Sequence, residues 1–229
     1  MVQVGNETTT GMCGETNWQN ICRLMNAGAK AIRNFDRDIL VAVHFTNPDK
    51  TDWFYKLADY LNTYKVDYDV FATSYYPFWH GTPANLTSVL KNISGKYNKY
   101  VMVAETSWVN SFDNVDETSN NVANKNDLGK FVSYDVGVQG QIDAVSDVFR
   151  AVADVGPKGL GAFYWEPAWL AVGTSYMQTL PVWERDGSGW ATKYAGEFDE
   201  DAGKYYGGSS WENQALFAAD GRPLESLDV

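Results

Sequence analysis

The sequence is poor in cysteine, histidine and positive charge, and it lacks a long apolar run. Its 229 residues include two cysteines and two histidines, and 18 Lys and Arg stand against 29 Asp and Glu, for a net charge of −11. Nucleic-acid binders need a basic surface, and an anionic membrane would repel this chain. No stretch approaches the roughly 18 apolar residues of a transmembrane helix, so we expect neither nucleic acid nor membrane insertion.

The scarce sulfur and imidazole groups exclude a metal-binding framework. Cys13 and Cys22 have no histidine near them, which leaves two free or structural thiols, or alternatively one disulfide. The segment from Met1 to Glu7 has neither a basic nor an apolar region, so it does not read as a signal peptide.

Aromatic residues, by contrast, are abundant. The chain holds 9 Trp, 14 Tyr and 11 Phe. One compact core does not need so many rings whose polar edges require partners, so we expect some of them to face a ligand. The length alone fits a (β/α)8 barrel, for which about 250 residues is typical.

Short β-rich runs alternate with longer segments of helical period, which indicates an α/β fold with a parallel sheet buried on both faces. The expected strands are residues 2–5, 39–45, 69–75, 100–105 and 159–166. The expected helices are residues 18–35, a segment through Trp53 to Leu61, then 84–94 and 138–155. This pattern predicts five strands, whereas a closed barrel needs eight.

Two long segments interrupt this alternation. Residues 110–135 are rich in Asn, Asp and Ser, which predicts a functional loop or an insertion. Residues 173–211 contain Trp183, Trp190, Gly207 and Gly208, and we interpret them either as a surface loop or as one wall of a binding cleft.

Two of the expected strands end in a glutamate, Glu7 after the first and Glu105 after the fourth. Parallel α/β barrels carry their catalytic groups at the carboxyl ends of strands. Two carboxylates there suffice for glycoside hydrolysis, with one as acid and the other as nucleophile or base. The alternative is that each glutamate caps a helix or pairs with a lysine.

Five motifs, in order along the chain, resemble the family 53 glycoside hydrolases, which are retaining endo-β-1,4-galactanases with a (β/α)8 barrel (TIM barrel). The motifs are Val2-Gln3-Val4-Gly5-Asn6-Glu7-Thr8, His44-Phe45-Thr46-Asn47-Pro48, Ser74-Tyr75-Tyr76-Pro77-Phe78-Trp79, Val103-Ala104-Glu105-Thr106 and Phe163-Tyr164-Trp165-Glu166-Pro167-Ala168-Trp169. The resemblance implies hydrolysis of the galactan side chains of pectic arabinogalactan.

The resemblance also implies a role for individual residues. Glu7 would be the general acid/base at the end of strand 4, and Glu105 would be the nucleophile at the end of strand 7. Asn6 would bind the sugar 2-hydroxyl, Tyr75 would orient the nucleophile, and Trp165 would form the floor of the cleavage subsite.

The sequence also leads to predictions for four further aromatic side chains. We expect His44, Trp79 and Trp108 to contact substrate, and His80 to be exposed in a loop rather than catalytic. For His44 a hydrogen-bonded position at the barrel rim is the alternative, and for the tryptophans it is core packing.

The resemblance starts within strand 4, so residues 1–229 are expected to be one catalytic-domain fragment, the last five βα units of a barrel. It implies a secreted or cell-surface enzyme, a monomer when full length, with a polysaccharide partner and no organic cofactor. Some bacterial relatives bind calcium after strand 7. Residues 113–121 offer oxygen ligands there, but lack the expected glycines and histidine.

Two other functions stay open at this stage. One is a different retaining β-glycanase of the same clan, a mannanase or a glucanase, which a panel of polysaccharides would distinguish. The other is a non-catalytic, carbohydrate-binding piece, because the five strands predicted here would leave open sheet edges.

Overall fold

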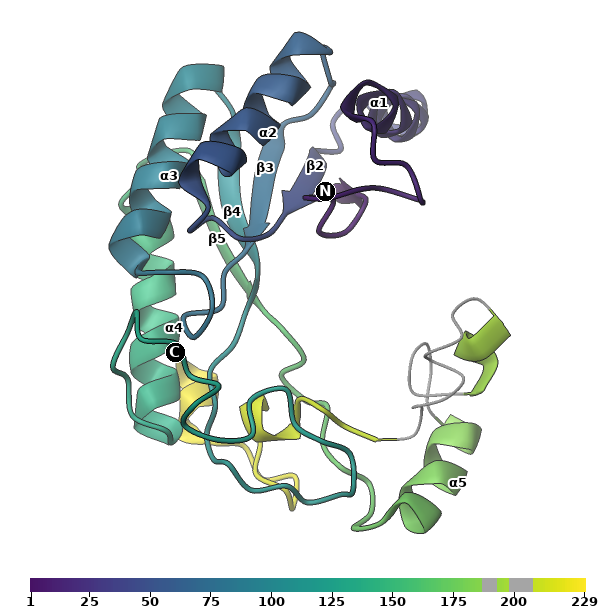
Figure 1. The fold of residues 1–229 in the computed structure, drawn as a ribbon, viewed down its shortest axis with the longest axis vertical. Helices are drawn as coiled ribbons and strands as arrows, with labels where there is room; N and C mark the ends of the chain where they lie inside the picture. The colour runs from purple at the N-terminus through teal and green to yellow at the C-terminus, as the bar shows by residue number, and fades with distance from the viewer. Residues whose placement is uncertain (187–192, 198–207) are drawn as a thin grey trace. The chain divides into compact units, whose positions relative to one another are not determined.

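The described chain contains a parallel five-stranded sheet with helices between its strands (Figure 1), which confirms the α/β prediction. The computed structural model describes residues 1–186, 193–197 and 208–229. The strands are β1 (Val2–Val4), β2 (Val41–Phe45), β3 (Val70–Ser74), β4 (Tyr100–Thr106) and β5 (Gly159–Tyr164). Each strand pairs in parallel with the next, in the order β1-β2-β3-β4-β5.

The chain divides into two compact units. The first comprises residues 1–107, 129–133 and 144–165 and holds the sheet, and the second comprises residues 108–128, 134–143 and 166–229. The helices that follow the first four strands are α1 (Trp18–Phe35), α2 (Thr51–Thr63), α3 (Pro83–Tyr97) and α4 (Val138–Ala153). No helix in the described ranges is long and apolar enough to cross a membrane.

The two faces of the sheet carry different side chains. Val43 of β2 and Phe71 of β3 point into the main core, where they meet Leu57 of α2 and other apolar helix residues. Ala42 and Ala72, one position along each strand, lie in a small separate cluster on the opposite face. Because side chains alternate along a strand, every second residue of β2 and β3 faces away from the helices.

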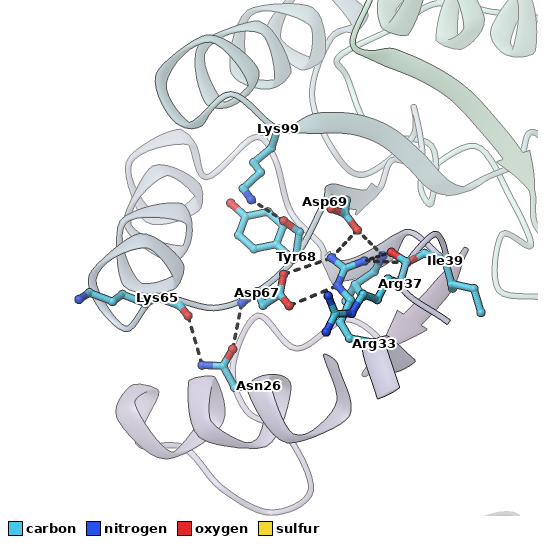
Figure 2. A network of polar contacts seen from close by, with 10 residues as sticks. Asn26, Arg33, Arg37, Ile39, Lys65, Asp67, Tyr68, Asp69 and Lys99 are labelled. Carbon is cyan, nitrogen blue, oxygen red and sulfur yellow. Dashed lines mark hydrogen bonds and ion pairs between the residues drawn. The ribbon is translucent and has the colours of Figure 1, made fainter. Parts of the chain in front are cut away.

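Helix α1 begins at an amide cap and ends in an ionic network. The side chain of Asn17 accepts hydrogen bonds from the backbone N–H groups of Gln19 and Asn20, which satisfies two of the free donors of the first turn. In the last turn, Arg33 reaches Asp67 at 3.1 Å and Asp69 at 2.7 Å (Figure 2).

The same arginine donates to the carbonyl of Ile39 at 2.8 Å, and Asp69 accepts the N–H of Val41 at 2.8 Å. This network therefore ties the end of α1 to the starts of β2 and β3.

Strand β4 contains an irregularity that reverses its alternation. Thr73 of β3 pairs with Val103, but the next residue, Ser74, pairs with Glu105, so Ala104 is an extra residue in β4. A bulge of this kind redirects the side chains that follow it. Glu105 consequently shares a face with Ser74, instead of joining Val103 in the main core.

In the second unit, buried Gln141 joins distant segments. Its side-chain amide donates to the carbonyls of Trp108, Gln214 and Ala215, and its carbonyl oxygen accepts from Ser226. This unit also contains α5 (Tyr176–Asp186), η2 (Lys193–Glu197), η3 (Glu212–Gln214) and η4 (Glu225–Asp228).

Helix α5 was not expected, because Pro181 lies inside it and masks its helical period. Trp183 belongs to this helix and Gly208 lies at the start of a described range, whereas Trp190 and Gly207 lie outside the described residues. The interpretation of residues 173–211 as a cleft wall therefore stays a prediction.

Candidate active site

A tight turn after β1 presents the first glutamate. Gly5 has φ +81°, and a Cβ atom at this position would come within 2.7 Å of the Thr8 side chain, so glycine is required there. Glu7 itself is left-handed, with φ 45°, and Thr8 donates its N–H to the carbonyl of His44 at 2.9 Å. The turn therefore bends the chain onto the end of β2 and holds Glu7 in a conformation that few non-glycine residues adopt.

Glu7 and Glu105 meet beside His44. A carboxylate oxygen of each glutamate and a ring nitrogen of the histidine all lie within 4.8 Å of one another. Glu7 is partly exposed, whereas Glu105 is 6% exposed and His44 is fully buried. The two residues predicted from strand ends 98 positions apart are thus brought together, by the turn after β1 and by the bulge in β4.

Tyr76 is the tyrosine whose hydroxyl contacts the Glu105 carboxylate, whereas Tyr75 donates its backbone N–H to the Glu105 carbonyl at 2.8 Å. The hydroxyl of Tyr76 donates to Glu105 Oε2 at 2.9 Å, whereas the hydroxyl of Tyr75 donates to the carbonyl of Gly81 at 2.9 Å. Tyr75 lies in the main core on the helix side of the sheet, and its successor points to the other side. The contact with the carboxylate that was expected of Tyr75 is therefore made by Tyr76.

His44 is part of the framework under the site and is fully buried, which corrects the expectation that it contacts substrate. Its Nε2 lies 2.9 Å from Ser74 Oγ, and its Nδ1 lies 3.1 Å from Asn6 Oδ1 and 3.1 Å from Gln3 Nε2. The N–H of Glu7 also points at Nδ1, at 3.4 Å. Burial lowers the pKa of His44 to about 4, so the ring is neutral at ordinary pH.

Asn6 is exposed, and its side-chain oxygen is directed at the ring of His44, so its binding of the sugar 2-hydroxyl stays a prediction. The carboxylates and the imidazole form the one group of three ionisable ligands within the described ranges that a metal ion could reach. Both nitrogens of His44 already have polar neighbours, so the arrangement suits a pair of carboxylates beside a neutral, hydrogen-bonded ring better than a metal site.

A short aromatic segment follows Tyr76. Trp79 is 40% exposed and packs edge-on against Tyr76, with ring centroids 5.4 Å apart, which leaves part of its surface open for a ligand. His80 is 5% exposed, so the expectation that it is exposed was wrong. Its N–H and that of Trp79 both donate to the Tyr76 carbonyl at 2.9 Å, and this turn folds the imidazole back beneath the strand end. The alternation of polar and apolar residues does not reveal such a turn.

The two remaining predicted tryptophans differ. Trp165 is half-buried just after β5, and its N–H donates to the carbonyl of Thr106, the residue after Glu105, at 2.8 Å. Trp108 is 1% exposed, its indole N–H donates to the carbonyl of Asp135 at 2.8 Å, and it packs edge-on against Tyr134. Trp108 is therefore a core residue of the second unit, and the expectation of sugar contact was wrong.

The acidic segment 113–121 uses its carboxylates to hold backbone. Asp116 accepts the N–H groups of Thr118 at 2.7 Å and Ser209 at 3.0 Å, and Glu117 accepts the N–H of Tyr176 at 2.8 Å. No three ionisable ligands of this segment converge within the described part of the chain. The carboxylates of Asp116 and Glu117 are thus hydrogen-bonded to the backbone and form no cluster with a third ionisable ligand.

Comparisons with known proteins identify the family of this chain. The family described as Glycosyl hydrolase family 53 matches residues 1–229. The Endo-beta-1,4-galactanase of Bacillus subtilis (strain 168) is 53% identical over 232 residues, covering 100% of this chain and 53% of the relative. The Arabinogalactan endo-beta-1,4-galactanase of Cellvibrio japonicus (strain Ueda107) is 31% identical, over 75% of this chain and 47% of the relative.

Among solved structures, the Ignisphaera aggregans GH53 catalytic domain superposes with a TM-score of 0.81 at 30% identity, covering 99% of this chain and 57% of that domain. The chain therefore spans about half the length of the relatives that it matches.

Proposed function

Because the chain belongs to glycosyl hydrolase family 53, we propose that it acts in the endo-hydrolysis of β-1,4-galactan, the side chain of pectic arabinogalactan. The 53% identity to the Bacillus subtilis galactanase over the entire chain favours this substrate over mannan or glucan. Galactan is a neutral polysaccharide, which suits an acidic chain whose exposed aromatic rings can stack on sugar faces.

The observation that carries the proposal is the close approach of two glutamates. Retaining glycosidases separate their carboxyl groups by roughly 5 to 5.5 Å, whereas inverting enzymes need roughly 6.5 to 9.5 Å to admit a water molecule. An oxygen of Glu7 and one of Glu105 lie within 4.8 Å of each other, which supports double displacement with retention.

In this mechanism, a carboxylate oxygen of Glu105 bonds to the anomeric carbon while the bond to the leaving galactan oxygen breaks, and Glu7 gives that oxygen its proton. Water then attacks the anomeric carbon and loses a proton to Glu7, which restores the acid and frees Glu105. Tyr76 donates to Glu105 in the ground state and keeps the nucleophile ionised and oriented. In this proposal Asn6 binds the sugar 2-hydroxyl, and Trp79 and Trp165 contact the sugar rings.

We also propose that β1 to β5 correspond to strands 4 to 8 of a (β/α)8 barrel, with residues 1–229 as one catalytic-domain fragment. The 57% coverage of the Ignisphaera domain supports this. The proposed reaction needs no organic cofactor, and the carboxylates of Asp116 and Glu117 accept backbone N–H groups. A secreted or cell-surface, monomeric enzyme fits a polymeric substrate.

The test incubates the 229-residue protein with β-1,4-galactan, mannan and β-glucan, and separates the released oligosaccharides. We expect galacto-oligosaccharides from galactan alone, and a loss of at least about 1,000-fold in Glu105→Gln. Equal release from Glu105→Gln would refute the assignment of the nucleophile. Binding to galactan without hydrolysis would instead favour a carbohydrate-binding role for this chain.

A further inference from the structure

His80 packs against Tyr76, the residue whose hydroxyl donates to Glu105. Its ring is 5% exposed and packs against Tyr76, with centroids 5.8 Å apart. The mechanism described above assigns it no task. A buried imidazole is costly to place unless its nitrogens have partners, so its contacts are informative.

One ring nitrogen holds the backbone of Tyr76. The N–H of Tyr76 donates to His80 Nδ1 at 3.0 Å, and the His80 N–H returns a hydrogen bond to the Tyr76 carbonyl at 2.9 Å. For Nδ1 to accept, it must carry a lone pair, which assigns the proton of the neutral ring to Nε2. The main chain of Tyr76 is thus held on both its N–H and its carbonyl by one residue.

The other side of the ring lies near the preceding strand residue, since a backbone contact with Ser74 influences the ring. Ser74 Oγ is 2.9 Å from Nε2 of His44, the histidine that borders Asn6 and Glu7. The segment from Ser74 to Tyr76 therefore touches the acid/base side through its first residue and the nucleophile through its last, and His80 holds the backbone of that last residue.

The surroundings keep this imidazole neutral. Burial lowers the pKa of His80 to about 4, and Lys50 acts in the same direction, whereas Asp49 and the contact with Ser74 oppose the change. A protonated ring would have no lone pair on Nδ1 for the N–H of Tyr76.

We infer that His80 is a positioning residue for catalysis, which fixes the strand end so that the Tyr76 hydroxyl meets Glu105. The inference rests on the proposed function for its kinetic consequences, but not for its structural ones. It separates His80 from an ordinary core residue, because a core residue would affect folding without moving the ionisation of a carboxylate that it does not touch.

The experiment compares His80→Leu, which removes the acceptor, with His80→Asn, whose side-chain oxygen can take the place of Nδ1. Carboxyl-carbon NMR titration of Glu105, assigned with Glu105→Gln, reports the contact without requiring turnover. We expect His80→Leu to raise the pKa of Glu105 in the same direction as Tyr76→Phe, and His80→Asn to restore most of the wild-type value.

With galactan as substrate, His80→Leu should lower kcat by about 10- to 100-fold, with a smaller change in KM, because the nucleophile is misplaced after binding. In a Tyr76→Phe background the same substitution should lower kcat by less than about 2-fold, since the contact that it acts through is already gone.

An unchanged titration of Glu105 in a folded His80→Leu protein, or additive kinetic losses with Tyr76→Phe, would overturn the inference. If His80→Leu fails to fold, His80→Gln replaces it, because the polar atoms of glutamine reach the position of Nε2 rather than that of Nδ1. A Glu105 titration in His80→Gln equal to that in His80→Asn would then refute the inference. Absence of galactan hydrolysis by the wild type, with the titration still shifting, would refute the proposed function and leave the positioning role intact.

Discussion

The two adjacent tyrosines at the end of β3 offer a matched pair of substitutions. Tyr76→Phe and Tyr75→Phe each remove one buried hydroxyl that makes a hydrogen bond of 2.9 Å. The partners differ: Tyr76 donates to the carboxylate of Glu105, and Tyr75 donates to the neutral carbonyl of Gly81. The pair therefore isolates the effect of the partner from the effect of losing a hydroxyl.

The expected magnitudes follow from the charge of each partner. A hydrogen bond to a charged group contributes about 1.5 to 3 kcal/mol, and one pKa unit corresponds to about 1.4 kcal/mol. Losing the Tyr76 hydroxyl should therefore raise the pKa of Glu105, because the charged form of the carboxyl loses a hydrogen-bond donor. Tyr75→Phe removes a neutral hydrogen bond and should lower the free energy of unfolding by about 0.5 to 1.5 kcal/mol.

The assay follows kcat/KM for galactan between pH 3 and pH 8, together with urea unfolding at pH 7. In Tyr76→Phe the acidic limb should move to higher pH, so that kcat/KM below this limb falls by about 10- to 100-fold. Tyr75→Phe should keep the limb of the wild type and lose stability only. A limb that moves in Tyr75→Phe and stays in place in Tyr76→Phe would refute the assignment of the two hydroxyls.

Three further outcomes are expected. Glu7→Gln should lower galactan hydrolysis by about 100-fold or more. Azide should restore the turnover of an aryl galactoside, because its aryl group leaves without acid assistance and azide then attacks the intermediate on Glu105. Failure of azide to give a galactosyl azide of retained configuration would contradict double displacement. His44 and His80 each have a pKa of about 4 in the folded protein, against about 6.5 in the unfolded chain, so the unfolded chain binds more protons between these two pH values. Urea unfolding should therefore show the free energy of unfolding falling by about 3 kcal/mol for each ring as the pH falls from about 6.5 to 4. A constant free energy of unfolding over this range would contradict the burial of the two rings as neutral groups. Asp116→Asn should lower the free energy of unfolding by about 1 to 3 kcal/mol, because the Asp116 carboxylate accepts two backbone N–H groups. EDTA should leave the Tm of the wild type unchanged, and a fall in Tm on chelation would show a bound cation instead.

The periodicity of the sequence is sufficient to predict the layers of the fold. The helix predicted at residues 18–35 has these same bounds in the structure, and all five predicted strands are present within a few residues of their expected ends. Apolar runs and amphipathic helices report burial directly, so they are readable without tertiary information. Helix α5 was missed because its internal proline and mixed polarity hide the helical period.

The second unit shows where periodicity is insufficient. Trp108 follows a catalytic strand and looks like a ligand-facing residue, but its indole N–H is held by Asp135, 27 positions later, in a loop without regular structure. Gln141 likewise joins segments that are 33 to 85 residues away. Such contacts depend on how irregular segments fold back, and neither propensity nor spacing encodes this in a form that can be read residue by residue.

The proposed catalytic pair, Glu7 and Glu105, shows the same limit most clearly, because simple alternation along β4 gives the wrong face for Glu105. Val101 and Val103 face the helices, so the next residue of the series would also enter the main core. An ionised carboxylate there would lose its hydration among aliphatic side chains, and its pKa would rise until it became neutral. The extra residue, Ala104, resets the series, and Glu105 pairs with Ser74 on the face that holds His44 and Glu7. The motif around Glu105 identifies this residue by resemblance, but the bulge is the physical reason that its side chain lies near Glu7 and not in the main core.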